Sequence, residues 1–321
     1  MKNMNVTKLL TTKNLTDKRL HLFKEKINNY TNLLNLPETL KESTLVADYL
    51  NAQSRRRAQT VGSAFDIAFK LFLALKHPKA SIKQYLKHSV FTKEPEVMKE
   101  ASTKLAEYDI TLEQLFYNTL ERVEELKVNK EGHIPFNSIV NYAVTLAWFE
   151  AYEKSGGYFP KDLEVVNPQS FEHATLVAEV TQLLEVAKND FTDFLLTKDK
   201  IIFNPRFDIG NKDLVLEGTG DLIAGDTLID IKTTGNIKTN HSNYMKQVLS
   251  YFELNKMLNK YDIKNIGLYY VRFNQIHEIV GVEIPEQKFE VVEVKKNETI
   301  EVDLKDIDNL LDLLGGEEDD K

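Results

Sequence analysis

Apolar residues recur at helical spacing over much of the first 200 residues of the 321-residue chain. This spacing predicts helices over residues 61–75, 114–127, 138–154 and 170–196. The first of these, VGSAFDIAFKLFLAL, is nearly all apolar and is expected to be buried. Residues 1–60 are also expected to be mostly helical, with a break at Pro37, because proline does not fit inside a helix.

After residue 200 the pattern changes to short runs of β-branched and aromatic residues bounded by glycine, asparagine and aspartate, which is typical of strands. The runs cover residues 201–209, 214–223, 227–234 and 266–273. A helical pattern over 243–258 separates the last two runs. This order predicts an α/β (α+β) fold in which a mixed central sheet is flanked by helices.

The length corresponds to two domains at roughly 150 residues each, or to one domain with a large insertion. Four regions are expected: a helical, basic N-terminal segment (1–60), a second helical region (61–165), a core that contains the sheet (166–300), and an acidic C-terminal helix with a tail (301–321). The last seven residues, GGEEDDK, are expected to be disordered because they have no apolar side chain to bury.

Two of the predicted strands meet at Gly225 and Asp226. Glycine at the first central position is what a two-residue type II′ hairpin loop requires. Such a loop fixes the register, in which the numbers of paired residues sum to 451. The register places Asp221 directly opposite Asp230.

Like charges in directly opposed positions of a hairpin destabilise it, because their Cβ atoms are only about 4.5–5.5 Å apart. Side chains alternate along a strand, so Lys232 shares the face of Asp230, whereas Ile229 and Ile231 point into a core. A divalent cation would relieve the repulsion, since oxygen ligands suit Mg²⁺. The alternative is a surface salt-bridge ladder in which Lys232 neutralises Asp230.

Residues 218–234, GTGDLIAGDTLIDIKTT, resemble the core of the PD-(D/E)XK nuclease superfamily, in which an Asp that ends one strand is followed by (D/E)-X-K on the next. Asp221 matches the first acid, and residues 230–232 match the second motif. Gln247 and Tyr251 match the Gln-X3-Tyr motif of the RecB-like branch, and their spacing of four places them on one helix face.

Upstream, residues 62–66 (GSAFD) resemble the Gly-X3-His motif of the same branch, although Asp66 stands where the histidine is found. The arrangement is also similar to the exodeoxyribonuclease VIII type. The four motifs fall within residues 55–75 and 200–275, under a third of the chain. The resemblance implies a restriction-endonuclease-like core, with a large helical N-terminal part in this chain.

The resemblance also implies a metal site. Asp221 and Asp230 would hold Mg²⁺, for which Mn²⁺ could substitute, with the Ile231 carbonyl as a further ligand, and Asp66 would complete the acidic site from its helix. The ion would lower the pKa of a bound water and stabilise charge on the phosphate. Lys232 would orient or deprotonate that water, or stabilise the developing negative charge.

Gln247 and Tyr251 would position the active-site groups or the DNA backbone by hydrogen bonds. The alternative is a helix on which Tyr251 packs against the sheet and Gln247 is simply exposed. Arg55, Arg56 and Arg57 precede the 62–66 motif and would contact DNA phosphates, since arginine binds them in a bidentate manner. Otherwise they form a solvated charged face.

Charge is unevenly distributed along the chain, whose net charge is −8. Residues 1–80 carry a net charge of +8, which hints at a polyanionic partner, and residues 301–321 carry −7. The acidic tail could compete with DNA for the basic region. It could also dock a basic partner, such as a recombination or single-strand-binding protein, or it could simply keep the chain soluble.

Several classes of site are excluded by composition. With no cysteine, the chain has no disulfide, cysteine-ligated zinc or iron–sulfur cluster. No H-E-X-X-H spacing, P-loop or G-X-G-X-X-G motif occurs. His241 is expected in an exposed loop, and Trp148 in the core. No transmembrane helix or signal peptide is expected, so the protein is expected in the cytoplasm, or in the host cytoplasm if it is viral.

These observations lead to the hypothesis of a Mg²⁺-dependent deoxyribonuclease, most simply an exonuclease of DNA recombination, DNA repair or phage DNA processing. Its partner would be DNA. One alternative is a catalytically silent nucleic-acid-binding or inhibitor protein with the same fold. Another is an acidic protein-interaction module whose hairpin carboxylates are structural, which the negative net charge favours.

Overall fold

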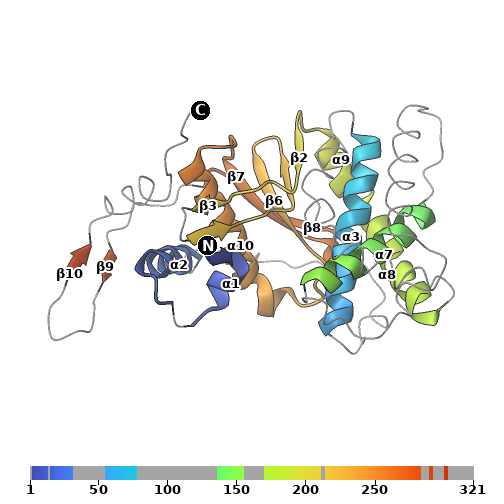
Figure 1. The fold of residues 1–321 in the computed structure, drawn as a ribbon. Coiled ribbons are helices and arrows are strands. Elements are labelled where there is room, and N and C mark those ends of the chain that lie inside the picture. Colours follow the sequence, from blue (N-terminus) through green and yellow to red (C-terminus); the bar gives the residue numbers. More distant parts are fainter. Residues whose placement is uncertain are drawn as a thin grey trace, which may run out of the picture.

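The computed structural model describes residues 2–13, 15–31, 55–77, 136–154, 170–210, 214–282, 289–291 and 300–302. Its fold combines helices with mixed sheets, as predicted (Figure 1). The predicted helix over 114–127, the break at Pro37 and the acidic tail beyond residue 302 lie outside the described residues.

The elements differ in length and in their place along the chain. The helices are α1 (Val6–Thr11), α2 (Lys18–Thr31), α3 (Arg55–Lys76), α7 (Phe136–Lys154), α8 (Phe171–Ala187), α9 (Asp190–Leu196) and α10 (Ile237–Leu258), with a 3-10 turn, η4 (Val271–Phe273). The strands are β1 (Lys2–Asn5), β2 (Ile201–Phe203), β3 (Ile209–Gly210), β4 (Leu214–Glu217), β5 (Leu222–Ala224), β6 (Thr227–Lys232), β7 (Asn265–Tyr270), β8 (Gln275–Ile279), β9 (Phe289–Val291) and β10 (Ile300–Val302).

The central sheet has the strand order β2-β5-β6-β7-β8. Its neighbours are antiparallel except for β6 and β7, which are parallel and are connected through α10. A parallel pair needs a crossover connection of this kind, and a helix is the usual one. The mixed sheet flanked by helices is therefore confirmed at this level of detail.

A second sheet has the order β1-β4-β3. Two segments of the chain pass directly from one sheet to the other. β2 and β3 follow one another along the chain, as do β4 and β5, and the Arg206–Thr219 bridge pairs the two segments between the sheets. The sequence did not predict β1, which lies in a region expected to be helical and pairs in parallel with β4. The division into four regions stays a prediction, but this pairing joins the first region to the third.

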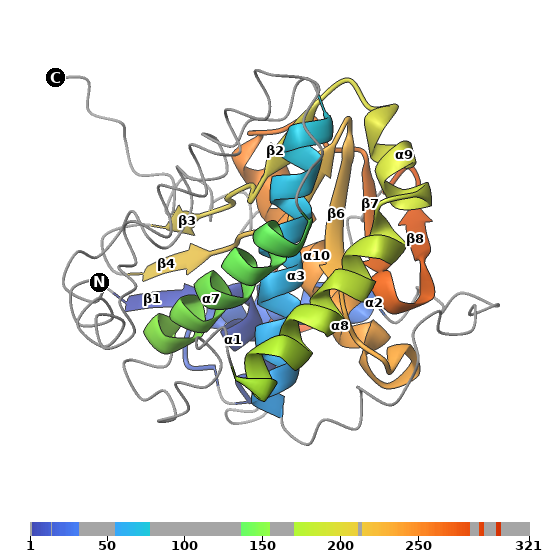
Figure 2. The same ribbon diagram turned by 90° about the vertical axis from the view of Figure 1, so that its right-hand side faces the viewer.

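Helices cover both faces of the central sheet (Figures 1 and 2), and each face carries its own hydrophobic core. One core contains α3, α7, α8 and α9, and the other contains α1, α2 and α10. Alternation along β6 assigns its residues to the two cores: Leu228 faces α10, whereas Ile229 and Ile231 face α3. The predicted direction of Ile229 and Ile231 is therefore confirmed, and Trp148 is buried as expected.

Two predicted helices have different bounds in the structure. The helix predicted over 61–75 is longer and spans Arg55–Lys76 as α3. The helix predicted over 170–196 is interrupted at Lys188 and Asn189, so that α8 and α9 are separate.

The apolar stretch Ala58–Lys76 of α3 has the length and hydropathy of a membrane span, but 67% of it is buried in the protein. The core helix of a water-soluble protein can have the same composition.

A buried ion pair ties the helical layer to the sheet. Arg272, in η4 after β7, pairs through Nη2 with Glu179 of α8, and both residues are at least 95% buried. The Arg272 Nε atom also donates a hydrogen bond to the Thr233 carbonyl at 2.6 Å, just beyond β6. The guanidinium thus connects α8 to the end of β6.

We expect Arg272→Met to lower the free energy of unfolding by about 3–5 kcal/mol, because it leaves the Glu179 carboxylate buried without its cation. The double variant Glu179→Leu/Arg272→Met should recover part of this loss. The measurement is urea denaturation. The control is Arg206→Met, since Arg206 pairs with Asp208 in a partly exposed position and its loss should cost less than about 1 kcal/mol. Equal losses in the two arginine variants would contradict the expectation.

His241 is not in an exposed loop, as the sequence had suggested. α10 begins at Ile237 rather than at residue 243, because Asn236 caps the helix by accepting a hydrogen bond from the Thr239 backbone N–H. His241 therefore lies inside α10 and is 3% exposed. Its Nδ1 is 2.6 Å from the Tyr270 hydroxyl, and its ring stacks on His277 at 5.2 Å between centroids. Burial, together with His277, lowers the pKa of His241 to about 4.

Acidification should destabilise the protein through this histidine. Because the pKa of His241 is about 4 in the folded state and about 6.5 when unfolded, the unfolded chain binds more protons between these values. The stabilisation is complete above pH 6.5 and is lost as the pH falls towards 4. His241 should contribute about 2 kcal/mol to the difference in unfolding free energy between pH 7.5 and pH 5. Urea denaturation of His241→Gln should show a correspondingly smaller pH dependence; an unchanged one would refute the assignment.

Candidate active site

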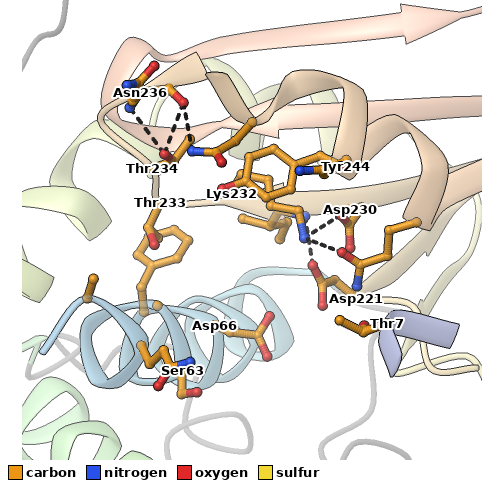
Figure 3. A pocket seen from close by; sticks show the side chains of 18 of the residues that line it. Thr7, Ser63, Asp66, Asp221, Asp230, Lys232, Thr233, Thr234, Asn236 and Tyr244 are labelled. Carbon is orange, nitrogen blue, oxygen red and sulfur yellow. Dashed lines mark hydrogen bonds and ion pairs between the residues drawn. The ribbon is translucent and has the colours of Figure 1, made fainter. Parts of the chain in front are cut away.

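A cavity of about 1070 Å³ lies at the C-terminal end of β6, between α3 and α10 (Figure 3). Its walls come from several parts of the chain. The lining residues include Thr7 and Thr11 of α1, Gly62, Ser63 and Asp66 of α3, Asp221, Asp230, Ile231 and Lys232 of the hairpin, and Asn240, Asn243, Tyr244 and Gln247 of α10. The predicted acids, lysine and glutamine therefore line one polar cavity.

The predicted hairpin register is confirmed for the three pairs between β5 and β6, from Leu222–Ile229 to Ala224–Thr227. Gly225 has a φ of 60°, and Asp226 does not have a positive φ, which is the combination expected of a type II′ loop. The regular pairing stops at Leu222, so Asp221 is the first residue beyond the strand.

Asp221 takes a different role from a simple cross-strand partner. Continuing the register would pair Ile231 with Gly220, but Gly220 instead donates its N–H to the Pro205 carbonyl. The Asp221 Oδ2 atom accepts the Ile231 backbone N–H at 2.7 Å in its place. The bend therefore fixes the Asp221 carboxylate against β6, on the side where it lines the cavity.

Asp230 and Lys232 form a buried ion pair. The Lys232 Nζ is 2.5 Å from Asp230 Oδ2, and the two side chains are only 15% and 2% exposed. The predicted shared face is confirmed, but the surface ladder is not, because the pair is inside the protein. Burial raises the pKa of Asp230, Lys232 opposes this effect and Asp221 adds to it, so that the pKa reaches about 7. Burial alone would lower the pKa of Lys232, but the charges of Asp230 and Asp221 raise it above its usual value.

The two residues of the Gln-X3-Tyr motif, on α10, extend the contacts of this ion pair by hydrogen bonds. Lys232 donates to Gln247 Oε1 at 3.2 Å, and Gln247 Nε2 donates to the Tyr251 hydroxyl at 2.8 Å. Tyr251 is 4% exposed and stacks on Phe207, so it also packs in the core as the alternative interpretation had it. Burial raises the pKa of Tyr251, and its hydroxyl is the neutral end of the chain of contacts. Tyr244 adds a cation–π contact, with Lys232 Nζ 4.9 Å from its ring centroid.

Asp66 projects from α3 towards the side of the cavity where Asp221 lies (Figure 3). Its Oδ2 is 2.6 Å from the Nζ of Lys70, one helical turn further along α3. Lys70 is 1% exposed and also donates to the side-chain oxygen of Asn204. Lys70 was not predicted as a site residue from the sequence. The spacing of four from Asp66 was the available signal, but the apolar neighbours of Lys70 made the segment look like an ordinary core helix.

Gly62 allows α3 to approach the end of β6. A Cβ atom at this position would be 3.2 Å from the Thr233 Oγ1. Glycine inside a helix costs about 1 kcal/mol relative to alanine, so its presence in α3 needs a compensating reason. The close approach supplies it, since it brings the helix that carries Asp66 to the cavity.

The structure describes four other candidate residues less completely. Arg55, Arg56 and Arg57 form the first residues of α3, but their side chains lie outside the described structure. Ile231 lines the cavity, and the metal-binding role of its carbonyl stays a prediction. In the described parts of the chain, no three acidic or histidine side chains gather closely enough to hold a metal ion by themselves.

The donor set nevertheless suits one divalent cation. Mg²⁺ is usually held by one or two carboxylates, with waters and substrate phosphates as its other ligands. Asp221 and Asp230 line the same cavity, and the charge of Asp221 contributes to the raised pKa of Asp230. A cation between two such carboxylates would offset their repulsion.

The contact between Gly62 and Thr233 can be tested by a double-mutant cycle. We expect the effect of Gly62→Ala on the free energy of unfolding to be more favourable by about 0.5–1 kcal/mol when Thr233 is also replaced by alanine. The hydroxyl oxygen that the new Cβ would meet is then absent. Unfolding free energies of the wild type, both single variants and the double variant give the coupling. Additive effects would show that α3 does not depend on this approach.

No model of a known protein family matches the chain, and a search of curated proteins finds no match either. The resemblance to PD-(D/E)XK nucleases therefore depends on the residues and their arrangement alone.

Proposed function

We propose that this protein is a Mg²⁺-dependent nuclease that hydrolyses phosphodiester bonds of DNA. The observation that carries the proposal is the convergence of Asp221, Asp230 and Lys232 at the end of β6, in a polar cavity that Gln247 also lines. Two carboxylates can hold the metal ion of a phosphodiester hydrolysis, and a lysine beside them can stabilise negative charge on the phosphate. Their order along the chain is that of the motifs described above.

Asp221 and Asp230 would hold the ion, and the bound ion would supply an activated water and stabilise charge on the phosphate. Mn²⁺ should substitute for Mg²⁺. Asp221 is already oriented by the Ile231 N–H, and the ion would take the place of part of the Lys232 charge beside Asp230. A metal ion binds the deprotonated carboxylate, so a bound cation would lower the pKa of Asp230, which burial raises.

Lys232 would then be available to the reacting phosphate. It keeps its proton at neutral pH, because the neighbouring carboxylates raise its pKa. It is therefore suited to stabilise negative charge or orient the attacking water, rather than to remove a proton. Gln247 would hold the ammonium in position, and Tyr251 would in turn hold the Gln247 amide.

The α10 wall of the cavity favours an extended polyanion as the substrate. Asn236, Asn240, Asn243 and Gln247 are spaced by four, three and four residues, which places their amide groups along one side of the helix. Uncharged amides and hydroxyls commonly contact phosphate and sugar oxygens of nucleic acids without reading the bases. An exonuclease of recombination, repair or phage DNA processing is the form of the activity that we propose.

The decisive experiment is digestion of end-labelled linear duplex and single-stranded DNA, with Mg²⁺ or with EDTA. We expect Mg²⁺-dependent release of short products, and a loss of at least about 100-fold in rate for Lys232→Ala, since it removes a charged group from the reacting centre. The matched control is Lys256→Ala, which changes an exposed lysine on the same helix as Gln247. Covalently closed circles test the requirement for an end.

Lys232→Ala removes the partner of a buried carboxylate, so its fold must be checked by circular dichroism. Asp221→Asn is a second variant that keeps an acceptor for the Ile231 N–H. Intact DNA in every arm, from folded wild-type protein, would contradict the proposal. Retention on DNA in Ca²⁺ would then favour a silent nucleic-acid-binding protein, and no retention would favour a protein-interaction module.

A further inference from the structure

Lys70 is a second buried lysine beside the candidate site, and the proposed function gives it no role. It is 1% exposed and follows Asp66 by one turn of α3. Its neighbours Phe69 and Leu71 belong to the hydrophobic core. Lysine is rarely buried to this extent unless its charge is paired, so this ammonium depends on the groups around it.

The Lys70 ammonium contacts two polar groups that come from different parts of the chain. One is the Asp66 carboxylate, at 2.6 Å, and the other is the side-chain oxygen of Asn204, which follows β2. Asn204 has a φ of 47°, in the left-handed region that asparagine tolerates better than most residues. Its own N–H donates to the Asp221 carbonyl at 3.1 Å. The ammonium is therefore joined through Asn204 to the segment that carries Asp221.

This arrangement makes Asp66 a poor metal ligand. A divalent cation that took the Asp66 carboxylate would separate a buried ammonium from its counter-ion, which is strongly unfavourable in a protein interior. The cation would also approach the positive charge of Lys70. Asp230 also pairs with a buried lysine, but Lys232 lies near two carboxylates, Asp230 and Asp221, so that negative charge remains there for a cation to balance. The Asp221 carboxylate accepts the neutral Ile231 N–H through Oδ2, and a cation at its other oxygen would not need to displace this bond.

We propose that Lys70 is a built-in cation on the α3 side of the site, and that the site takes one divalent cation rather than two. The ion is held by Asp221 and Asp230, while Asp66 serves Lys70 and does not ligate the metal. This assignment rests on the proposed function, because it concerns the metal ion of that site. It replaces the role in metal binding that the sequence had suggested for Asp66.

The test is binding of Mn²⁺ to the whole chain, measured by calorimetry and by the electron paramagnetic resonance of free Mn²⁺. Binding at the site is counted as the difference from Asp221→Asn, which corrects for weak binding to the acidic residues 301–321. The wild type should bind one ion. The double variant Asp66→Asn/Lys70→Met, which removes the pair while keeping its approximate shape, should bind the same single ion with an affinity within twofold.

The single variant Lys70→Met should gain affinity or a second ion, because Asp66 then faces the cavity without the ammonium. If this variant does not fold, the double variant still decides the question. Two ions in the wild type, or a loss of at least tenfold in affinity in the double variant, would overturn the single-ion assignment and leave the proposed function standing. No difference between the wild type and Asp221→Asn would overturn both.

Discussion

The structure around the site depends on the burial of two opposite charges at the end of β6. Asp230 and Lys232 lie in a strand whose apolar residues belong to two hydrophobic cores. Burying either charge without its partner would be far less favourable than exposing both, so the pair requires that neighbouring elements supply further polar contacts. Gln247 on α10 and the bend at Asp221 supply them, and these contacts in turn determine how the helix and the hairpin approach the strand.

The two sides of the site solve the same electrostatic problem in different ways. On the α10 side, Lys232 donates a hydrogen bond to the Gln247 amide and lies near the Tyr244 ring. Its partner Asp230 has a second carboxylate, that of Asp221, nearby. On the α3 side, Lys70 is enclosed by Asp66 and Asn204. The first arrangement leaves negative charge to be balanced, whereas the second is already balanced. This difference explains how three acids can line one cavity and yet differ in what they can bind.

Local rules predicted the hairpin well, because a two-residue loop with glycine first leaves a single register, and that register places Asp230 and Lys232 on one face. They could not predict that Asp221 would leave the ladder, since that depends on the competing bond from Gly220 to Pro205. They also missed β1, whose pairing with β4 joins distant parts of the chain, and the Lys70–Asn204 contact, which a helical pattern does not reveal. The chemistry predicted for these residues is still a proposal.

The parallel pairing of β1 with β4 has a consequence for how the molecule is made. Contacts between residues far apart in sequence form slowly, because the intervening chain must first be ordered. β1 precedes α3, α7 and α8 along the chain, and its partner β4 is synthesised only after them. The hairpin that carries Asp221 begins directly after β4. Completion of the smaller sheet and assembly of the cavity therefore both require the segment that begins at β4.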